Sequence, residues 1–231
     1  MRGVFATIAD RYDLITVLLS YGQDRRWKGR LVGLAGDVRG CRVLDLACGT
    51  GDITMAVAAN GAKTFGLDLT PRMIELAVAR RDAGASAGER PVFLVGDMGA
   101  LPFPSGSFDV VTTGYGLRNV PNIDRAVAQI ARVLRPGGLL LSLDFNRPSS
   151  PFVRAAYHTY LSCVGSALGW VLHRDPNTYR YIPESIRLYP GANRVIDILR
   201  AHGFSRAAWH PVLGGLLAIH EARKGTRAES G

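Results

Sequence analysis

Short apolar runs alternate with segments of helical periodicity between residues 42 and 145. The apolar runs predict five buried strands, over residues 42–47, 63–68, 91–97, 107–116 and 139–145. A strand followed by a helix and then by another strand is typical of a βαβ unit, whose crossover is right-handed. The pattern therefore predicts an α/β protein with a doubly wound, mostly parallel sheet.

Local signals mark where the helices between these strands begin and end. The helix predicted over residues 52–60 is followed by Gly61, which suits the left-handed position after a helix end. Before the next helix, Thr70 offers a side-chain cap and Pro71 occupies the first helical position. A third helix is predicted over residues 122–134, and we expect the RPGG sequence after it to end the helix. Its apolar stripe consists of Ile123, Ala126, Val127, Ile130 and Leu134.

Two segments fall outside the alternation of strands and helices. Residues 1–36 carry an amphipathic pattern, and residues 148–200 form a helical, aromatic-rich insert. The amphipathic positions of the first segment include Val17, Leu18 and Tyr21. We expect residues 1–36 to be a helical lid, and residues 37–231 to form a single domain with the insert on its substrate side. Residues 204–222 have the pattern of two further strands.

Composition and charge narrow the class of protein. The chain has 231 residues, 47% of them apolar, with a mean hydropathy of +0.08, as expected for a globular protein. The three cysteines are far apart, which indicates neither disulfides nor a zinc site and fits a cytoplasmic location. The net charge of +9 comes from scattered arginines, so we expect no nucleic-acid partner. Attraction to an anionic membrane surface is left open.

Candidate chemistry gathers where the first strands end. Asp45, Ala47, Gly49 and Gly51 lie at the end of the first strand, and glycines there let the backbone approach a ligand closely. The carboxylate of Asp68 closes the second strand and can accept two hydrogen bonds from ribose hydroxyls. Ligands bind at the carboxyl ends of parallel strands, so these residues predict a cofactor site.

A third acid extends the predicted cofactor site. Asp97 closes the third strand, in a position to receive an adenine amino group. The glycine turn lacks the third glycine that makes room for a pyrophosphate, so we expect S-adenosylmethionine, which has no phosphate. The alternatives are a tight turn without a ligand, and acids that only cap helices.

Several sequence blocks identify a family by resemblance. VLDLACGTGD, GLDLTPRMIELA, GDMGALPFPSGSFDVVTTGYGLRNV, RVLRPGGLLLSLDF, YRYIPESI and LGGLLAIH occur in this order. They resemble the ubiquinone/menaquinone biosynthesis C-methyltransferases, and the resemblance extends from about Val4 to His220. The first block is shared by many class I methyltransferases, whereas GLRNV and YRYIPESI are more specific. The sequence departs from the family pattern at Thr16, Asp144 and Asn146.

The resemblance implies a Rossmann-like, seven-stranded sheet with an antiparallel last strand. It also implies methyl transfer from S-adenosylmethionine to a ring carbon of a polyprenyl quinol. The substrate expected is demethylmenaquinol, the corresponding benzoquinol of ubiquinone synthesis, or both. The residues expected to bind the cofactor are Asp45, Ala47, Gly49, Gly51, Asp68, Leu69, Asp97, Met98 and Thr113.

Four residues are candidates for catalysis. A phenol, whose pKa is about 10, donates ring electrons poorly until its proton leaves. We expect Arg118 to stabilise the developing oxyanion, Asn119 to orient the ring, and Tyr115 to lie near the ring or the methionyl group. His158 in the insert is a candidate base. The alternatives are that Arg118 pairs with a structural carboxylate, that Tyr115 is a core residue with a satisfied hydroxyl, and that His158 only packs.

Two other functions remain open at this stage. One is an O- or N-methyltransferase of another small aromatic compound, and the other is a non-catalytic S-adenosylmethionine-binding assembly protein. The partners expected are the polyprenyl quinol, a membrane surface contacted peripherally at its inner face, and a second copy in a homodimer. No metal is expected, because the histidines lack the spacing of metal ligands.

Overall fold

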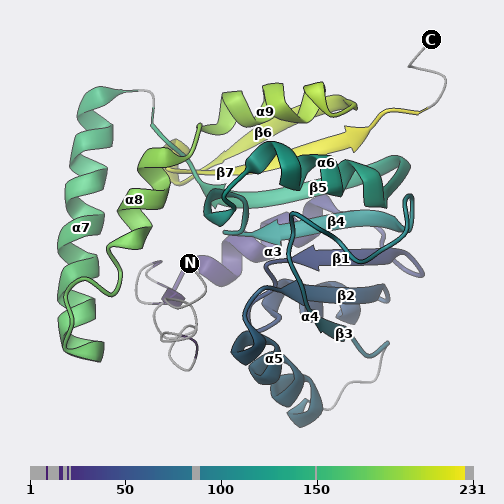
Figure 1. Cartoon of the computed structure of the whole chain (residues 1–231), viewed down its shortest axis with the longest axis horizontal. Coiled ribbons are helices and arrows are strands. Elements are labelled where there is room, and N and C mark those ends of the chain that lie inside the picture. The colour runs from purple at the N-terminus through teal and green to yellow at the C-terminus, as the bar shows by residue number, and fades with distance from the viewer. Residues whose placement is uncertain are drawn as a thin grey trace.

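The structure, a computed structural model, describes residues 9, 16–17, 20, 22–84, 89–148 and 150–226 (Figure 1). Its seven strands are β1 (Arg42–Leu46), β2 (Lys63–Asp68), β3 (Val92–Val95), β4 (Phe108–Gly114), β5 (Leu134–Phe145), β6 (Phe204–Val212) and β7 (Leu217–Lys224). They form one sheet in the order β3-β2-β1-β4-β5-β7-β6. β7 is antiparallel to both of its neighbours, and the other pairs are parallel. The predicted fold class is confirmed.

Helices cover both faces of this sheet. They are α3 (Asp24–Leu34), α4 (Asp52–Ala59), α5 (Pro71–Ala83), α6 (Ile123–Val133), α7 (Pro151–His173), α8 (Tyr181–Leu188) and α9 (Ala192–Ala201). Val43 of β1 packs in a core with Leu31 of α3 and Ile53 of α4. The next residue, Leu44, packs in the opposite core with residues of α6 and α9. Successive strand residues point to opposite faces, so a strand between two helical layers is apolar throughout.

Two local predictions need correction. α6 ends at Val133, but the RPGG sequence is part of β5, which begins at Leu134 rather than at residue 139. The β4–β5 register shifts between Phe108 and Val110, and this bulge lets β5 absorb its glycines. Thr70 makes no side-chain cap for α5; its backbone N–H donates to Asp68 Oδ1 at 2.8 Å, and its side chain also bonds Asp68. Gly61 has a φ of +86°, as predicted for the residue after α4.

The helices α7 and α8 of the insert lie beyond the carboxyl ends of the parallel strands (Figure 1). α3 belongs to the segment 1–36 and packs against α4, whereas Leu18 and Tyr21 lie outside the described residues. In the insert, α7 packs against α8 at the edge of the molecule, and α9 packs on β6. None of the helices in the described ranges has the length and hydrophobicity needed to cross a bilayer.

Candidate active site

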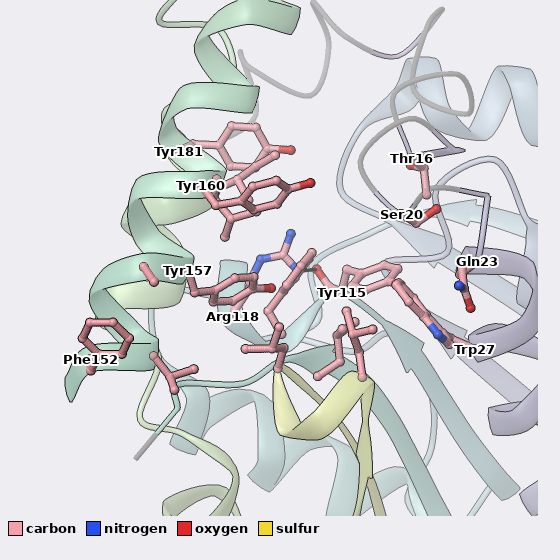
Figure 2. A pocket seen from close by; sticks show the side chains of 18 residues that line it. Thr16, Ser20, Gln23, Trp27, Tyr115, Arg118, Phe152, Tyr157, Tyr160 and Tyr181 are labelled. Carbon is pink, nitrogen blue, oxygen red and sulfur yellow. Dashed lines mark hydrogen bonds between the residues drawn. The ribbon is translucent and has the colours of Figure 1, made fainter. Parts of the chain in front are cut away.

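Two neighbouring cavities lie at the carboxyl ends of the strands, and Tyr115 and Arg118 line both of them. The smaller cavity, of about 210 Å³, is bordered by the turns after β1, β2 and β3. The larger cavity, of about 470 Å³, lies between α3, α7 and α8 (Figure 2). The predicted cofactor residues that line the smaller cavity are Ala47, Gly49, Asp68, Leu69, Asp97 and Met98.

The turn after β1 has the backbone conformation that its glycines predict. Ala47, Gly49 and Gly51 have φ angles of +50°, +55° and +88°. A Cβ atom on Gly51 would lie 2.8 Å from the Phe93 ring, so a larger residue does not fit there. Gly51 itself precedes α4 and does not line the smaller cavity. Gly51 instead lets the turn between β1 and α4 adopt a left-handed backbone conformation. The turn then presents the backbone of Gly49 to the smaller cavity.

Asp68 is held in place by backbone hydrogen bonds. Its Oδ2 accepts the Gly49 N–H at 2.9 Å, and its Oδ1 accepts the Thr70 N–H at 2.8 Å. Burial raises the pKa of Asp68, while these hydrogen bonds oppose the increase. Each carboxylate oxygen has a second lone pair, so Asp68 can bind the turn and still accept ribose hydroxyls.

Asp97 is more exposed than Asp68 and lies across the same cavity. Its Oδ1 accepts the Gly99 N–H at 2.7 Å. Asp68 thus binds the residue that precedes α5, as the helix-cap alternative expects, whereas Gly99 lies in a turn and Asp97 caps no helix. These hydrogen bonds orient the two carboxylates at the cavity rather than remove them from it. The side chains of Leu69 and Met98 give the cavity an apolar wall against which an adenine ring can pack.

The structure places Asp45 away from the smaller cavity. Its Oδ2 accepts the Thr54 hydroxyl at 2.6 Å and its Oδ1 accepts the Thr112 hydroxyl at 2.8 Å. Burial raises the pKa of Asp45 to about 6, against these two hydrogen bonds. Asp45 instead lines an adjoining cavity of about 20 Å³, which shares Ala47, Gly49 and Tyr115 with the smaller cavity. Thr113 also does not line the smaller cavity, because it is buried beneath Gly116.

Tyr115 joins the end of β4 to the helix of the first segment. Its hydroxyl donates to Asp24 Oδ1 at 2.8 Å. The Lys28 ammonium lies 2.6 Å from Asp24 and 2.9 Å from Asp52, at the start of α4. The satisfied hydroxyl matches the structural alternative for Tyr115, while its ring lines both cavities. This network ties α3 to the helix that follows the glycine turn.

Arg118 forms a buried ion pair with Asp144. One guanidinium nitrogen lies 2.7 Å from Asp144 Oδ1, and the two side chains are 5% and 0% exposed. The guanidinium also donates to the Ser185 hydroxyl at 3.3 Å and lies 4.7 Å from the centre of the Phe145 ring. Pairing with a structural carboxylate, the alternative for Arg118, is therefore observed. The same guanidinium still borders both cavities.

Asn119 lies beside Arg118 in the short helix η2 (Leu117–Asn119). Its amide nitrogen donates to the Tyr115 carbonyl at 2.8 Å, and the residue lines the smaller cavity. Its amide oxygen is buried without a hydrogen-bond partner in the described part of the chain. A buried acceptor without a partner is costly, so this oxygen is available to a ligand donor.

Aromatic side chains form the walls of the larger cavity. Tyr157 and Tyr160 extend into it from α7, and Trp27 faces them from α3 (Figure 2). Residues of both the predicted lid and the predicted insert thus line this cavity. Burial raises the pKa of the Tyr157 hydroxyl, although the nearby Arg118 charge lowers it. Tyr157 is not among the residues predicted from the sequence, although its helical spacing from Tyr160 and Leu161 is a signal for it.

His158 does not reach the larger cavity. It is exposed on another face of α7, where it lines two grooves between α7 and α8. Adjacent helical residues point about 100° apart, so Tyr157 faces the larger cavity while His158 turns away from it. The structure therefore does not bring His158 together with Arg118, Asn119 and Tyr115.

The smaller cavity fits S-adenosylmethionine. Asp68 offers acceptors for ribose hydroxyls, and the apolar wall and the exposed carboxylate of Asp97 suit an adenine. Its side facing Tyr115 and Arg118 adjoins the larger cavity, which would hold the methyl acceptor. Sheet order and site together define a class I methyltransferase that uses S-adenosylmethionine.

Comparisons with known proteins identify the family within this class. The model of the ubiE/COQ5 methyltransferase family matches residues 1–224. A demethylmenaquinone methyltransferase of Thermus thermophilus is 41% identical over 219 residues, which cover 94% of this chain and 98% of that protein. The ubiquinone/menaquinone biosynthesis C-methyltransferase UbiE of Azotobacter vinelandii is 36% identical over 96% of this chain and 88% of its own length. This chain belongs to the ubiE/COQ5 family and is an S-adenosylmethionine-dependent C-methyltransferase.

Solved structures support the fold. Magnesium protoporphyrin IX methyltransferase from Synechocystis, with bound SAH, superimposes with a TM-score of 0.68 at 19% identity. The match covers 97% of this chain and 98% of that chain. At this level of identity the likeness concerns the fold alone.

Proposed function

We propose that this enzyme methylates a ring carbon of a polyprenyl quinol, converting demethylmenaquinol to menaquinol. The observation that carries the proposal is the aromatic cavity of about 470 Å³ beside the cofactor cavity, with Tyr115 and Arg118 lining both. A flat quinol ring can stack on aromatic side chains, and an apolar cavity suits a prenyl tail. The names of the relatives support this substrate class, and the corresponding benzoquinol is the second candidate substrate.

Arg118 is proposed to act on the acceptor. The ring becomes a good carbon nucleophile when a quinol hydroxyl loses its proton, and the N–H groups of Arg118 stabilise the resulting oxyanion. Bound S-adenosylmethionine supplies a methyl group on a positively charged sulfur. A guanidinium repels that charge, so Arg118 acts from the quinol side. Its pairing with Asp144 limits this repulsion and holds the guanidinium in one orientation.

The remaining residues orient the quinol and exclude water. Asn119 Oδ1 is a buried acceptor without a partner among the described residues, and since Asn119 lines the smaller cavity beside Arg118, it is proposed to orient the ring from the cofactor side. The walls formed by Trp27, Tyr157 and Tyr160 keep water from the reacting atoms, which strengthens the attraction between the quinolate and the sulfonium. Holding the reacting atoms about 3–3.5 Å apart makes the step effectively intramolecular.

The prenyl tail also bears on where the enzyme works. A polyprenyl quinol resides in lipid, so the enzyme is proposed to be cytoplasmic and to contact the inner face of the membrane peripherally. The homodimer stays a prediction.

A complementation experiment with an isotope label tests the function. The chain is expressed in cells that lack their own quinone C-methyltransferase and are fed methyl-labelled methionine. We expect methylated menaquinone to reappear, with the label on a ring carbon in mass fragmentation. A label on oxygen or nitrogen would contradict C-methylation of the quinol. A protein that binds S-adenosylmethionine but restores no methylated quinone would favour a non-catalytic role.

A further inference from the structure

One face of α7 is uncharged and exposed along the length of the helix. Phe152 and Trp170 are 83% and 66% exposed, and their separation of 18 positions corresponds to five turns, so both lie on this face. The exposed residues between them on the same face are Thr159, Cys163 and Ser166. α7 contains no acidic residue. We call these five residues the outer face of α7.

The opposite face of α7 holds the helix against the rest of the insert. Leu161, Gly165 and Gly169 are buried where α7 packs against α8 and the turn before it. α7 lies at the edge of the molecule, with α8 between it and the sheet (Figure 1). A helix that is held on one side only leaves its other side to solvent or to a partner.

Arginines line a groove along one side of the outer face. Its lining includes Arg147, Arg154, His158 and Arg187, and the described residues contribute no carboxylate to it. Pro148, Pro151, Ala155 and Ile186 make its floor apolar. Leu188, next to Arg187, is 77% exposed. The helix thus offers apolar side chains flanked by positive charge.

The larger cavity adjoins this surface on the other side of α7. Phe152 belongs to both the outer face and the cavity lining, and Tyr157 and Leu161 line both the cavity and the arginine groove. The N-terminal half of α7 is therefore a wall between the two. Whatever contacts the outer face lies next to the larger cavity.

We propose that α7 docks on an anionic phospholipid bilayer, with its outer face against the lipid and the arginine groove on the phosphate headgroups. Tryptophan and phenylalanine favour the boundary between headgroups and acyl chains, and arginine binds phosphate through paired N–H donors. The surface combines an uncharged face that carries two exposed aromatic side chains with cationic flanks, as an interfacial helix does. Docking would place the larger cavity at the membrane, and this last consequence alone rests on the proposed function.

Charge favours a bilayer over a second copy of the chain. A symmetric dimer through the outer face would bring Arg147, Arg154 and Arg187 close to their own copies, and the chain carries a net charge of +9. An anionic lipid surface is attracted by the same arginines.

Vesicle flotation tests the docking without quinol or cofactor. The whole protein is mixed with vesicles of phosphatidylcholine alone, or with vesicles in which phosphatidylglycerol replaces a third of it. We expect flotation with the anionic vesicles, weakening as salt is raised, and little with the neutral vesicles. The variant R147Q/R187Q should reduce partitioning onto anionic vesicles by about tenfold or more, since each basic residue contributes about a factor of five.

Matched variants separate docking from general charge and hydrophobicity. R39Q/R135Q removes two arginines at the opposite end of the strands, and we expect it to float like the wild type. Trp170→Ser should weaken flotation, whereas Val95→Ser, at a 53% exposed position on the edge strand β3, should not. Turnover of a short-tailed quinol should be unchanged in all four variants, which shows that they fold.

Several outcomes would overturn the docking proposal. They are absence of flotation with anionic vesicles, equal losses in the control variants, and binding to inorganic phosphate that is as strong as binding to vesicles. A dimer in sedimentation that Trp170→Ser dissociates would show that a second copy occupies the outer face. Flotation by a protein that methylates no quinol would contradict the proposed function and leave the docking supported.

Discussion

The Arg118 guanidinium lies 2.7 Å from the Asp144 carboxylate, and this buried pair stands where the two cavities meet. Asp144 also accepts the backbone N–H groups of Arg118 and Phe145, at 3.1 and 2.8 Å. The Asp144 carboxylate therefore fixes both the side chain and the backbone of Arg118. Removing one member of such a pair leaves a charge buried without compensation.

Replacing Arg118 separates catalysis from stability. We expect Arg118→Ala to lower the free energy of unfolding by about 3–5 kcal/mol, because Asp144 keeps an uncompensated charge. Turnover at saturating quinol should fall by about 100-fold or more, because the oxyanion loses its donor. Arg118→Ala/Asp144→Asn should recover much of the stability and none of the turnover. Denaturant titration and steady-state rates measure the two effects, and normal turnover in the single variant would refute the catalytic role.

Asp68 is expected to dominate the affinity for the cofactor. Asp68→Asn replaces a charged acceptor, so the Kd for S-adenosylmethionine should rise by about 10- to 100-fold. Asp82→Asn, on the surface of α5 and paired with Arg81, is the matched control and should bind like the wild type. Isothermal titration calorimetry gives both values. An unchanged Kd for Asp68→Asn would remove the ribose role from this carboxylate.

Asp45 makes the stability of the domain depend on pH. Burial raises its pKa to about 6 from an ordinary value of 3.8, so the folded state holds this proton more tightly than the unfolded state. The stabilisation is complete below about pH 4 and is lost as the pH rises through about 6. The wild type loses this stabilisation as the pH rises and Asp45→Asn does not. The free energy of unfolding of the variant, relative to that of the wild type, should therefore rise by about 3 kcal/mol between pH 4 and pH 7. Unfolding both proteins across this range measures the gain, and parallel pH profiles would contradict the shifted pKa.

Tyr157 is expected to contribute to quinol binding. Burial raises the pKa of its hydroxyl, so the hydroxyl stays protonated and can donate a hydrogen bond inside the larger cavity. Tyr157→Phe should raise the KM for a short-tailed quinol by about fivefold to tenfold, the worth of one hydrogen bond. The Kd for S-adenosylmethionine should not change.

The neighbouring residue supplies the control for this prediction. His158→Gln alters the adjacent side chain, which lies in the α7–α8 grooves instead of the larger cavity, and its KM should match that of the wild type. A larger effect from His158→Gln than from Tyr157→Phe would show that the acceptor binds on the other side of α7.

Boundaries set by short-range signals were predicted well. β2 begins and ends at the predicted residues, because the charged residues Lys63 and Asp68 mark the two ends of a short uncharged segment. The start of β5 was misplaced, because the bulge that admits its glycines exists only against β4. The sequence of one strand does not determine the register in which a neighbouring strand pairs with it.

The two acids Asp68 and Asp45 differ in the same way, because one has local partners and the other has a distant partner. Asp68 binds backbone groups of Thr70, two residues away, and of Gly49 in the turn after the adjacent strand, so its position at the end of a strand was informative. Asp45 has the same kind of position, but its partner Thr112 is 67 residues away in the chain. Only the folded structure brings the Thr112 hydroxyl to the Asp45 carboxylate, which is buried there.

Periodicity and strand-end chemistry were enough to predict the strands, their helices and a nucleoside site, because each of these leaves a pattern within a short stretch of sequence. The Arg118–Asp144 pair, the Tyr115–Asp24 hydrogen bond and the aromatic cavity were decided by packing. They join residues 26 and 91 positions apart in the first two cases. Such contacts form only when the strands and the flanking helices have taken their places, since no local preference favours one distant partner over another.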